Sequence, residues 1–137
     1  MATGFEGKTI IITGASEGIG RALALDLAGQ RARLALAARS ADRLEELARD
    51  CEARGAEAIT VTCDVSAEAD CQRIVEETVA RFGALDALVA NAGRTMWSEF
   101  EALADLRVIE QVMAVNYFGA VYCIRAALPH LRRSGGR

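Results

Sequence analysis

The stretch Thr-Gly-Ala-Ser-Glu-Gly-Ile-Gly at residues 13–20 decides the fold of this chain. It lies between an apolar run at residues 10–12 and a helical pattern in which Ile19, Leu23 and Leu27 recur every four residues. A strand that ends in such a turn and leads directly into a helix directs several unpaired backbone N–H groups toward one point. The helix dipole adds partial positive charge there. The stretch therefore predicts a phosphate-binding turn.

The three glycines of this turn stand where a side chain would obstruct packing or binding. Gly14 allows the chain to turn out of the strand, Gly18 lets the backbone approach a ligand, and Gly20 lets the helix pack close to the sheet. The alternative is a strand-to-helix connection that binds nothing. The other residues of the turn that we expect to contact a cofactor are Ser16, Glu17 and Ile19.

Length and composition indicate a single domain. The chain has 137 residues, 52% hydrophobic and 26% charged, with one proline, which suits a compact α/β protein. Its net charge of −3 and its scattered arginines offer no basic surface for nucleic acid. Because the four cysteines form no C-x-x-C motif and His130 is the only histidine, we expect no metal site.

The N-terminal residues do not resemble a signal peptide, because Glu6 precedes an apolar run of only a few residues. No apolar run in the chain reaches the length of about 18 residues that a membrane span requires. We therefore expect a cytoplasmic protein that has no membrane span.

Strand and helix patterns alternate along the chain. Apolar runs predict strands at residues 8–13, 33–38, 57–65 and 84–91. The helices predicted between them cover residues 19–29, 41–54 and 67–83, and the second and third of these follow the N-caps Ser40 and Ser66. This alternation is typical of an α/β fold with a doubly wound parallel sheet of the Rossmann type. We treat residues 1–137 as one domain.

A polar loop after Gly93 leads to a long helix, which we expect at about residues 105–131. This helix carries more apolar side chains than the one stripe that covers a sheet. The surplus predicts a second buried face, either against another subunit or against chain that is absent here. Both alternatives stay open for this chain, and for the full-length protein we expect a homo-oligomer that forms through the helix. The apolar residues are Ile109, Val112, Met113, Tyr117, Phe118, Val121, Tyr122, Ile124 and Leu128.

The end of the second strand indicates the class of cofactor. An NAD enzyme needs a carboxylate near this position to bind the ribose 2′-hydroxyl, whereas this chain has Arg39 and Ser40, which suit a 2′-phosphate. The alternative is that Arg39 is a solvated charge at a strand end. Glu17 opposes the assignment because it adds negative charge nearby. We predict NADP, with NAD as the less favoured cofactor.

Several short motifs resemble those of the short-chain dehydrogenase/reductase family. The Thr-Gly-x-x-x-Gly-Ile-Gly spacing of residues 13–20 resembles the family's opening motif, and residues 90–93, Ala-Asn-Ala-Gly, resemble its Asn-Asn-Ala-Gly signature with the first Asn replaced. Asp64 and Val65 resemble an Asp-Val pair of the family, and Asn116 matches an Asn in its long helix. The resemblance covers nearly the whole chain and implies a sheet with the strand order 3-2-1-4.

The resemblance also implies roles for these residues. Asp64 and Val65 would contact the adenine ring, and Asn91 would tie adjacent strands together. Asn116 would hold a water molecule in a proton relay of the active site. The alternatives are that Asp64 caps the following turn and that Asn116 bonds a neighbouring backbone group. Two small residues that would leave room for the cofactor are Ala92 and Gly93.

The family's chemistry needs a Ser, a Tyr and a Lys four residues after the Tyr, and this chain lacks that set. Its only lysine is Lys8, and neither Tyr117 nor Tyr122 is followed by a lysine four residues later. The last residues, 134–137, resemble a loop that leads into a fifth strand. We interpret the chain as truncated, with a bare edge on the fourth strand, and expect no turnover from it alone.

The hypothesis from the sequence is an NADP-dependent short-chain oxidoreductase that transfers hydride between the nicotinamide and a carbonyl or alcohol substrate. This chain would carry the cofactor-binding half. The alternative is a non-catalytic dinucleotide-binding or regulatory module, which would bind the cofactor without chemistry. A serine followed by Tyr-x-x-x-Lys in sequence beyond Arg137 would favour the enzyme.

Overall fold

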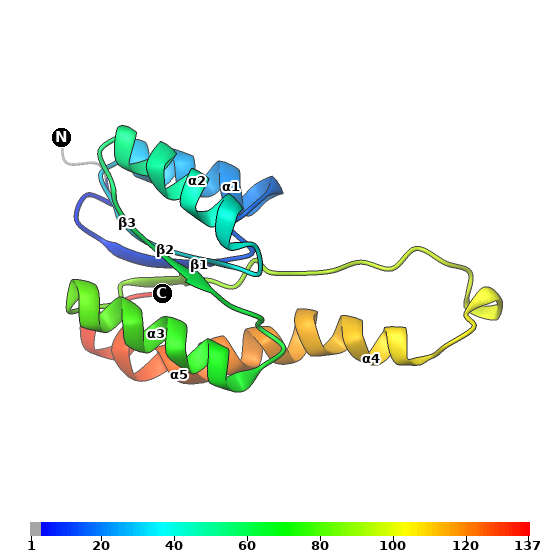
Figure 1. Ribbon diagram of the computed structural model, residues 1–137. Coiled ribbons are helices and arrows are strands. Elements are labelled where there is room, and N and C mark those ends of the chain that lie inside the picture. The colour runs from blue at the N-terminus through cyan, green and yellow to red at the C-terminus, as the bar shows by residue number, and fades with distance from the viewer. Residues whose placement is uncertain (1–3) are drawn as a thin grey trace.

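The strands form one parallel sheet with the order β3-β2-β1-β4 in the computed structural model, which describes residues 4–137 (Figure 1). The predicted doubly wound sheet and its strand order are confirmed. Ile10 and Ile12 of β1 face one buried cluster and Ile11 faces the other, so residues 10–12 are apolar on both faces of the sheet. The strands are β1 Thr9–Thr13, β2 Arg33–Ala38, β3 Glu57–Thr62 and β4 Ala87–Val89.

Helices cover both faces of the sheet. They are α1 Gly18–Gly29, α2 Ala41–Ala53, α3 Glu68–Phe82, α4 Arg107–Met113 and α5 Gly119–Ser134, with a short 3-10 helix at Phe100–Ala102. Figure 1 shows α1 and α2 on one face and α3 and α5 on the other. Each pair packs over its own buried apolar cluster, so the sheet has a core on either side.

Helix α1 packs on the sheet with a face that differs from the predicted stripe. Ile19 is 80% exposed, whereas Gly20, Ala24 and Ala28 are buried together with Leu27. The buried face is made of small side chains because the helix lies close to the first strand and to the turn that precedes it.

Some predicted boundaries are wrong at the carboxyl ends of the strands. Strand β3 ends at Thr62, and the chain then turns at Asp64, whose carboxylate accepts from the Ser66 N–H at 3.0 Å. Strand β4 is Ala87–Val89 and not 84–91. Ser66 is not the N-cap of α3; that position is Ala67. Ser40 does occupy the N-cap of α2, but its side chain makes no capping hydrogen bond.

The predicted long helix is continuous from Arg107 to Ser134, but it is not regular. A π-helical turn at Ala114–Phe118 separates α4 from α5. Such a turn holds one residue more than an α-helical turn and is frequent at functional sites. Asn116 lies in the middle of it.

One face of α5 packs into the protein and another is exposed. Cys123 and Ala127 are buried in the core that α5 shares with α3. The exposed apolar side chains lie on other faces of the π-helical turn and α5 and are Tyr117, Phe118, Val121, Ile124 and Leu128. The surplus apolar face that the sequence predicts is therefore present, and the homo-oligomer that it suggests stays a prediction.

The helix at Arg107–Ser134 has 28 residues and a mean hydropathy of 1.3 in its most apolar segment, which is long and apolar enough to cross a membrane. A helix that covers a sheet can have the same length and composition. The expectation that the chain has no membrane span stays a prediction.

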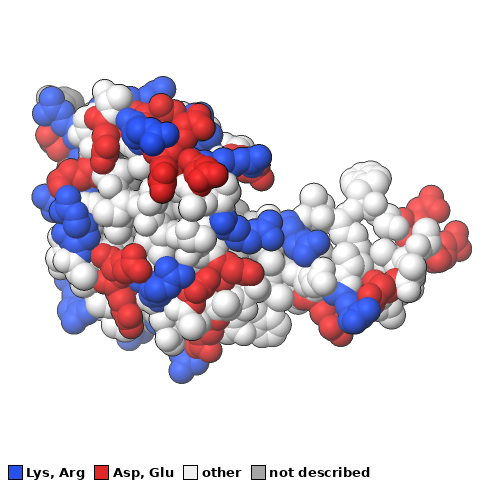
Figure 2. Space-filling model, in the orientation of Figure 1, with Lys and Arg blue, Asp and Glu red and all other residues white. Residues whose placement is uncertain are grey.

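An arm formed by residues 94–106 leaves the body after β4, and the chain returns to the body through α4 (Figure 1). The Trp97 side chain on the arm is 100% exposed and that of Phe100 is 75% exposed. On the face shown in Figure 2, basic and acidic side chains are interspersed over the body, without a large area of one sign.

The free edge of β4 is partly paired by the end of the chain, which differs from the bare edge that the sequence predicts. The Arg137 N–H donates to the Asp86 carbonyl at 2.9 Å, and its carbonyl accepts from the Leu88 N–H at 2.9 Å. The Ser134 hydroxyl also donates to the Leu85 carbonyl, at 2.6 Å. These bonds place the last residue alongside β4 in the manner of an adjacent strand.

Candidate functional site

The glycine-rich turn joins β1 to α1 at the carboxyl edge of the sheet, with two of its glycines in tight contact. Gly14 has φ +65°, and a Cβ on it would lie 2.7 Å from the Ala92 Cα. A Cβ on Gly20 would collide with the Gly14 carbonyl oxygen and lie 2.6 Å from Asn91 Nδ2. The predicted role of Gly20 in close packing is therefore confirmed. The first N–H groups of α1 have no intrahelical acceptor and remain available to an anion.

A hydrogen-bond network fastens this turn to the end of β4. Asn91 Nδ2 donates to the carbonyls of Thr13 and Gly14 at 3.1 and 3.2 Å. Thr13 Oγ1 accepts from the N–H groups of Asn91 and Ala92, each at 3.0 Å. The prediction that Asn91 ties adjacent strands together is confirmed, and the two strand ends form one wall of the site.

A cavity of about 500 Å³ opens at this edge of the sheet. Doubly wound sheets bind ligands at this position, outside the carboxyl ends of the strands. Gly18, Ile19, Gly20 and Asn116, which the sequence also suggests, do not line it. The predicted residues that line it are Gly14, Ser16, Glu17, Arg39, Ser40, Asp64, Val65, Asn91, Ala92 and Gly93.

A larger groove of about 830 Å³ follows the outer side of β3 between α2 and α3. Charged side chains such as Glu45 and Arg81 stand at its rim. It contains neither the glycine-rich turn nor the end of β4. The smaller cavity is the better candidate site because it combines residues of the glycine-rich turn, small residues of the strand ends and charged side chains.

Two charged residues that line the cavity, Arg39 and Glu17, differ in their partners. Within residues 4–137, the exposed Arg39 guanidinium makes no hydrogen bond or ion pair. Glu17, in contrast, accepts a hydrogen bond from Arg43 Nη1 at 2.7 Å. Arg39 is therefore a free cation at the cavity, as a binder of an anionic group requires.

Asp64 shapes the loop after β3. Its carboxylate accepts hydrogen bonds from the Ser66 N–H at 3.0 Å and from the Ser66 hydroxyl at 2.7 Å. The alternative that Asp64 caps the following turn is confirmed, and its contact with adenine stays a prediction. Val65, 6% exposed, packs against Gly119 of α5, so this loop is anchored to the helix layer.

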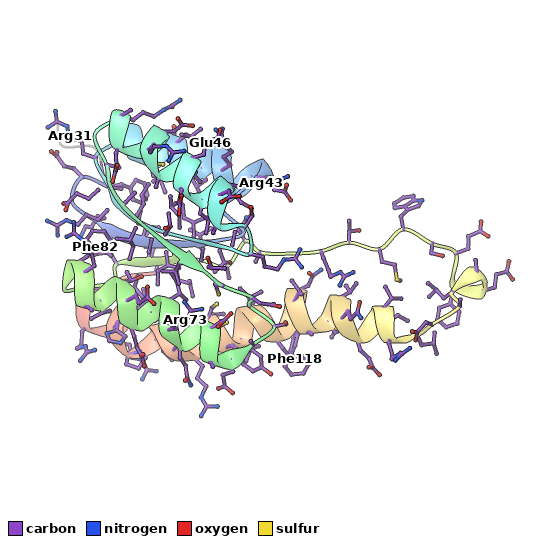
Figure 3. The ribbon with its side chains drawn as sticks, viewed as in Figure 1. Arg31, Arg43, Glu46, Arg73, Phe82 and Phe118 are labelled. Carbon is purple, nitrogen blue, oxygen red and sulfur yellow. The ribbon has the colours of Figure 1, made fainter. Side chains whose placement is uncertain are left out.

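A second carboxylate holds the same loop from α3. Asp70 Oδ2 accepts from the Asp64 N–H at 2.8 Å, and Asp70 Oδ1 accepts from Arg73 at 2.9 Å. The Asp64 N–H, followed by the Arg73 guanidinium, holds the pKa of the Asp70 carboxyl below its usual range. Arg73 also donates to the Thr62 carbonyl at 2.7 Å, which fixes the end of β3 to α3 (Figure 3).

Asn116 joins the π-helical turn to the start of the arm. Its Oδ1 accepts from the Arg94 N–H at 2.8 Å, and its Nδ2 donates to the Arg94 carbonyl at 2.9 Å. Both polar groups of the Asn116 side chain thus bond the Arg94 backbone, which confirms the alternative that Asn116 bonds a neighbouring backbone group. The proton relay stays a prediction.

Several residues that line the cavity were missed from the sequence. Arg43 and Arg94 are charged side chains whose partners lie 26 and 17 residues away, so no local spacing reveals them. Ser66 would have been found by asking which group Asp64 can bind two residues later. The remaining missed lining residues are Ala38, Cys63, Gln111 and Val115.

The Cys63 thiol at the cavity is not an activated nucleophile. Its hydrogen bond with Cys71, together with burial, raises the pKa of Cys63 well above its usual range, so the thiol stays protonated at neutral pH. Among residues 4–137, no group of three His, Cys, Asp or Glu side chains is arranged to hold a metal ion.

The sequence matches a known family over almost its whole length. A family model described as short chain dehydrogenase matches residues 8–137. The chain belongs to the short-chain dehydrogenase family. It is 48% identical over 132 residues to 11-beta-hydroxysteroid dehydrogenase 1A of Arabidopsis thaliana and 43% identical over 133 residues to 11-beta-hydroxysteroid dehydrogenase of Pinus massoniana. Each match covers 96% of this chain but only 38% and 37% of the respective relative.

Solved structures of short-chain dehydrogenases share the fold. An alcohol dehydrogenase from Thermococcus sibiricus, complexed with 5-hydroxy-NADP, superposes with a TM-score of 0.89 at 38% identity, over 94% of this chain and 55% of that one. The NADH-dependent reductase A1-R′, complexed with NAD, superposes with a TM-score of 0.85 at 34% identity, over 95% and 54%. This chain thus spans about half the length of each of these two solved structures.

Proposed function

We propose that this chain is the cofactor-binding part of an NADP-dependent short-chain oxidoreductase. The full-length protein would transfer hydride between the nicotinamide and a carbonyl or alcohol substrate. The observation that carries the choice of NADP is the unpaired Arg39 guanidinium at the mouth of the cavity, with Ser40 beside it. Solved relatives with NADP-type and NAD cofactors support a nicotinamide dinucleotide of either kind.

The residues of the cavity fit such a cofactor. The glycine-rich turn and the N-terminus of α1 would hold the pyrophosphate, since a Cβ at Gly14 or Gly20 would clash with neighbouring backbone and close the turn. Asp64 would face the adenine, and Arg39 would pair with the 2′-phosphate. When bound, the cofactor supplies the hydride chemistry, and this chain binds and orients it.

The choice of cofactor is tested by measuring the binding of NADPH and NADH to the full-length protein under the same conditions. We expect tighter binding of NADPH, detected as a change in the fluorescence of the reduced nicotinamide. Equal affinities, or tighter binding of NADH, would contradict the proposal.

The second candidate function is a non-catalytic dinucleotide-binding module. The chain contains no Tyr-x-x-x-Lys sequence, but it spans only 38% of the relative from Arabidopsis thaliana, so the full-length protein has to be tested. The two functions are separated by turnover: the full-length protein should oxidise NADPH with a carbonyl substrate, whereas a module would only bind it. The relatives named as hydroxysteroid dehydrogenases make a ketosteroid the first substrate to test.

We also propose that the full-length protein is cytoplasmic and forms a homo-oligomer through α5. Exposed apolar side chains on this helix, such as Val121 at 42% and Ile124 at 48%, support a further contact there. Sedimentation of the purified protein would test the oligomer, and cell fractionation would test the location.

A further inference from the structure

Glu17 is the residue of the cavity that least suits an NADP site. It lies directly before α1 and lines the same cavity as Arg39. The other carboxylate in the cavity, Asp64, is occupied by Ser66. A free Glu17 carboxylate would repel a 2′-phosphate, which carries close to two negative charges at neutral pH.

The structure gives Glu17 a partner from a different element. Arg43 Nη1 lies 2.7 Å from Glu17 Oε2, and the pair joins the glycine-rich turn to the first turn of α2. Figure 3 shows Arg43 at the end of α2 that faces the carboxyl ends of the strands. The pair leaves Arg39 as the cation of this region without a partner among the described residues 4–137.

We infer that Arg43 determines cofactor specificity through Glu17, as the counter-ion that masks the Glu17 carboxylate from the 2′-phosphate. The inference rests on the proposed NADP function. In this role Arg43 is a positioning residue: it need not touch the cofactor, because it acts on the charge of its neighbour. The rival explanation is that Arg43 itself binds the 2′-phosphate, as Arg39 is proposed to do.

A double-mutant cycle in the full-length protein separates these explanations. Arg43→Ala should weaken NADPH binding by about 3- to 10-fold, the size expected for an unscreened charge at the surface of a site. NADH binding should weaken less, because NADH has no 2′-phosphate. Glu17→Gln alone should bind NADPH at least as well as the parent protein.

The double variant Glu17→Gln with Arg43→Ala distinguishes masking of Glu17 by Arg43 from direct binding of the 2′-phosphate by Arg43. We expect its NADPH affinity to return to within about 2-fold of that of Glu17→Gln, because no carboxylate is left to mask. The loss in Arg43→Ala should also shrink in 0.5 M salt, where the Debye length is only about 4 Å. A double variant as weak as Arg43→Ala would overturn the inference, and so would an Arg43→Ala variant with unchanged NADPH affinity.

Arg33→Ala is a matched control. Arg33 also pairs with a glutamate, at 3.1 Å from Glu57, but both residues begin their strands at the opposite edge of the sheet. The variant loses the same charge and should bind both cofactors like the parent protein. The parent's own preference between NADPH and NADH tests the proposed function, whereas the rescue by Glu17→Gln tests the role of Arg43, so the two can fail separately.

Discussion

The carboxyl edge of the sheet and the arm formed by residues 94–106 meet at the same cavity but are built differently. At the sheet edge, Thr13, Gly14 and Asn91 are joined by short hydrogen bonds, and a Cβ at Gly14 would clash with backbone. On the arm, Trp97 and Phe100 expose most of their rings. The difference teaches that the strand ends at the cavity are held together by contacts within this chain, whereas the arm has apolar surface that further contacts would cover.

The largest effect is expected where the sheet edge is tightest. Gly20→Ala should destabilise the full-length protein by about 3 kcal/mol, because the new Cβ overlaps the Gly14 carbonyl and the Asn91 amide. Urea unfolding would measure the change. Gly29→Ala is the control: its Cβ would meet nothing within 4 Å, so stability should stay the same or rise slightly. If Gly20→Ala and Gly29→Ala changed the free energy of unfolding equally, the tight packing inferred for the sheet edge would be contradicted.

The next effect concerns cofactor choice. Arg39→Asp should lower the preference for NADPH over NADH by about 10- to 100-fold, because a cation suited to a 2′-phosphate becomes a carboxylate suited to a 2′-hydroxyl. The measurement is the ratio of the two dissociation constants. An unchanged ratio would show that Arg39 is only a solvated charge at the strand end.

A smaller effect is expected at the loop after β3. Asp70→Asn should cost about 1–2 kcal/mol, because the charged acceptor for the Asp64 N–H and Arg73 is lost. Since the folded-state pKa of Asp70 is lowered, its carboxylate stabilises the fold above the unfolded-state pKa. This stability is lost as the pH falls through the folded-state pKa.

The pH dependence provides the check on Asp70. The difference in unfolding free energy between the parent and Asp70→Asn should be constant near neutral pH and shrink in acid. A difference that did not change between neutral pH and strong acid would show that the carboxylate charge is unimportant.

The smallest effect is expected on the arm. Trp97→Ser should change the stability of the isolated chain by less than about 0.5 kcal/mol, because the ring is fully exposed. In the full-length protein the same substitution should cost more if the arm acquires contacts there. Comparing the two unfolding curves, with Trp97→Phe as the conservative control, would measure the contribution of those contacts.

The fold could be predicted from the sequence to a large extent, because alternating apolar runs and helical stripes indicate a doubly wound parallel sheet. The strand order was implied by the resemblance to the short-chain dehydrogenase/reductase family and not by this pattern. The strand order and most helix bounds are confirmed. The exposed Ile19 was misassigned because each step of four residues turns an α-helix by about 40° beyond a full turn, so a stripe with that spacing drifts away from the buried face. The π-helical turn around Asn116 has no local sequence signature, and Asn116 bonds the backbone of Arg94, which lies 22 residues earlier.

The site could be predicted only in part. The glycine-rich turn, Arg39 and Asp64 were found because they stand next to strand ends. The pairs Glu17–Arg43 and Arg94–Gln111 were not, because their partners come from elements that meet only in the folded chain. Contacts between elements decide which charged side chains at the site are paired and which are free. The sequence shows only which charged residues are present.

The Thr13 hydroxyl has a consequence for the motions of the site. Its oxygen accepts the amide hydrogens of Asn91 and Ala92, each at 3.0 Å, so a side chain of β1 protects two backbone amides at the end of β4. The Asn91 N–H also donates to the Val89 carbonyl at 3.0 Å, whereas the Ala92 N–H depends on Thr13, so the Ala92 amide exchanges with solvent deuterium when the end of β4 separates from the turn. The exchange rate of the Ala92 amide therefore reports how often this wall of the cavity opens, and each opening separates the glycine-rich turn from the strand end.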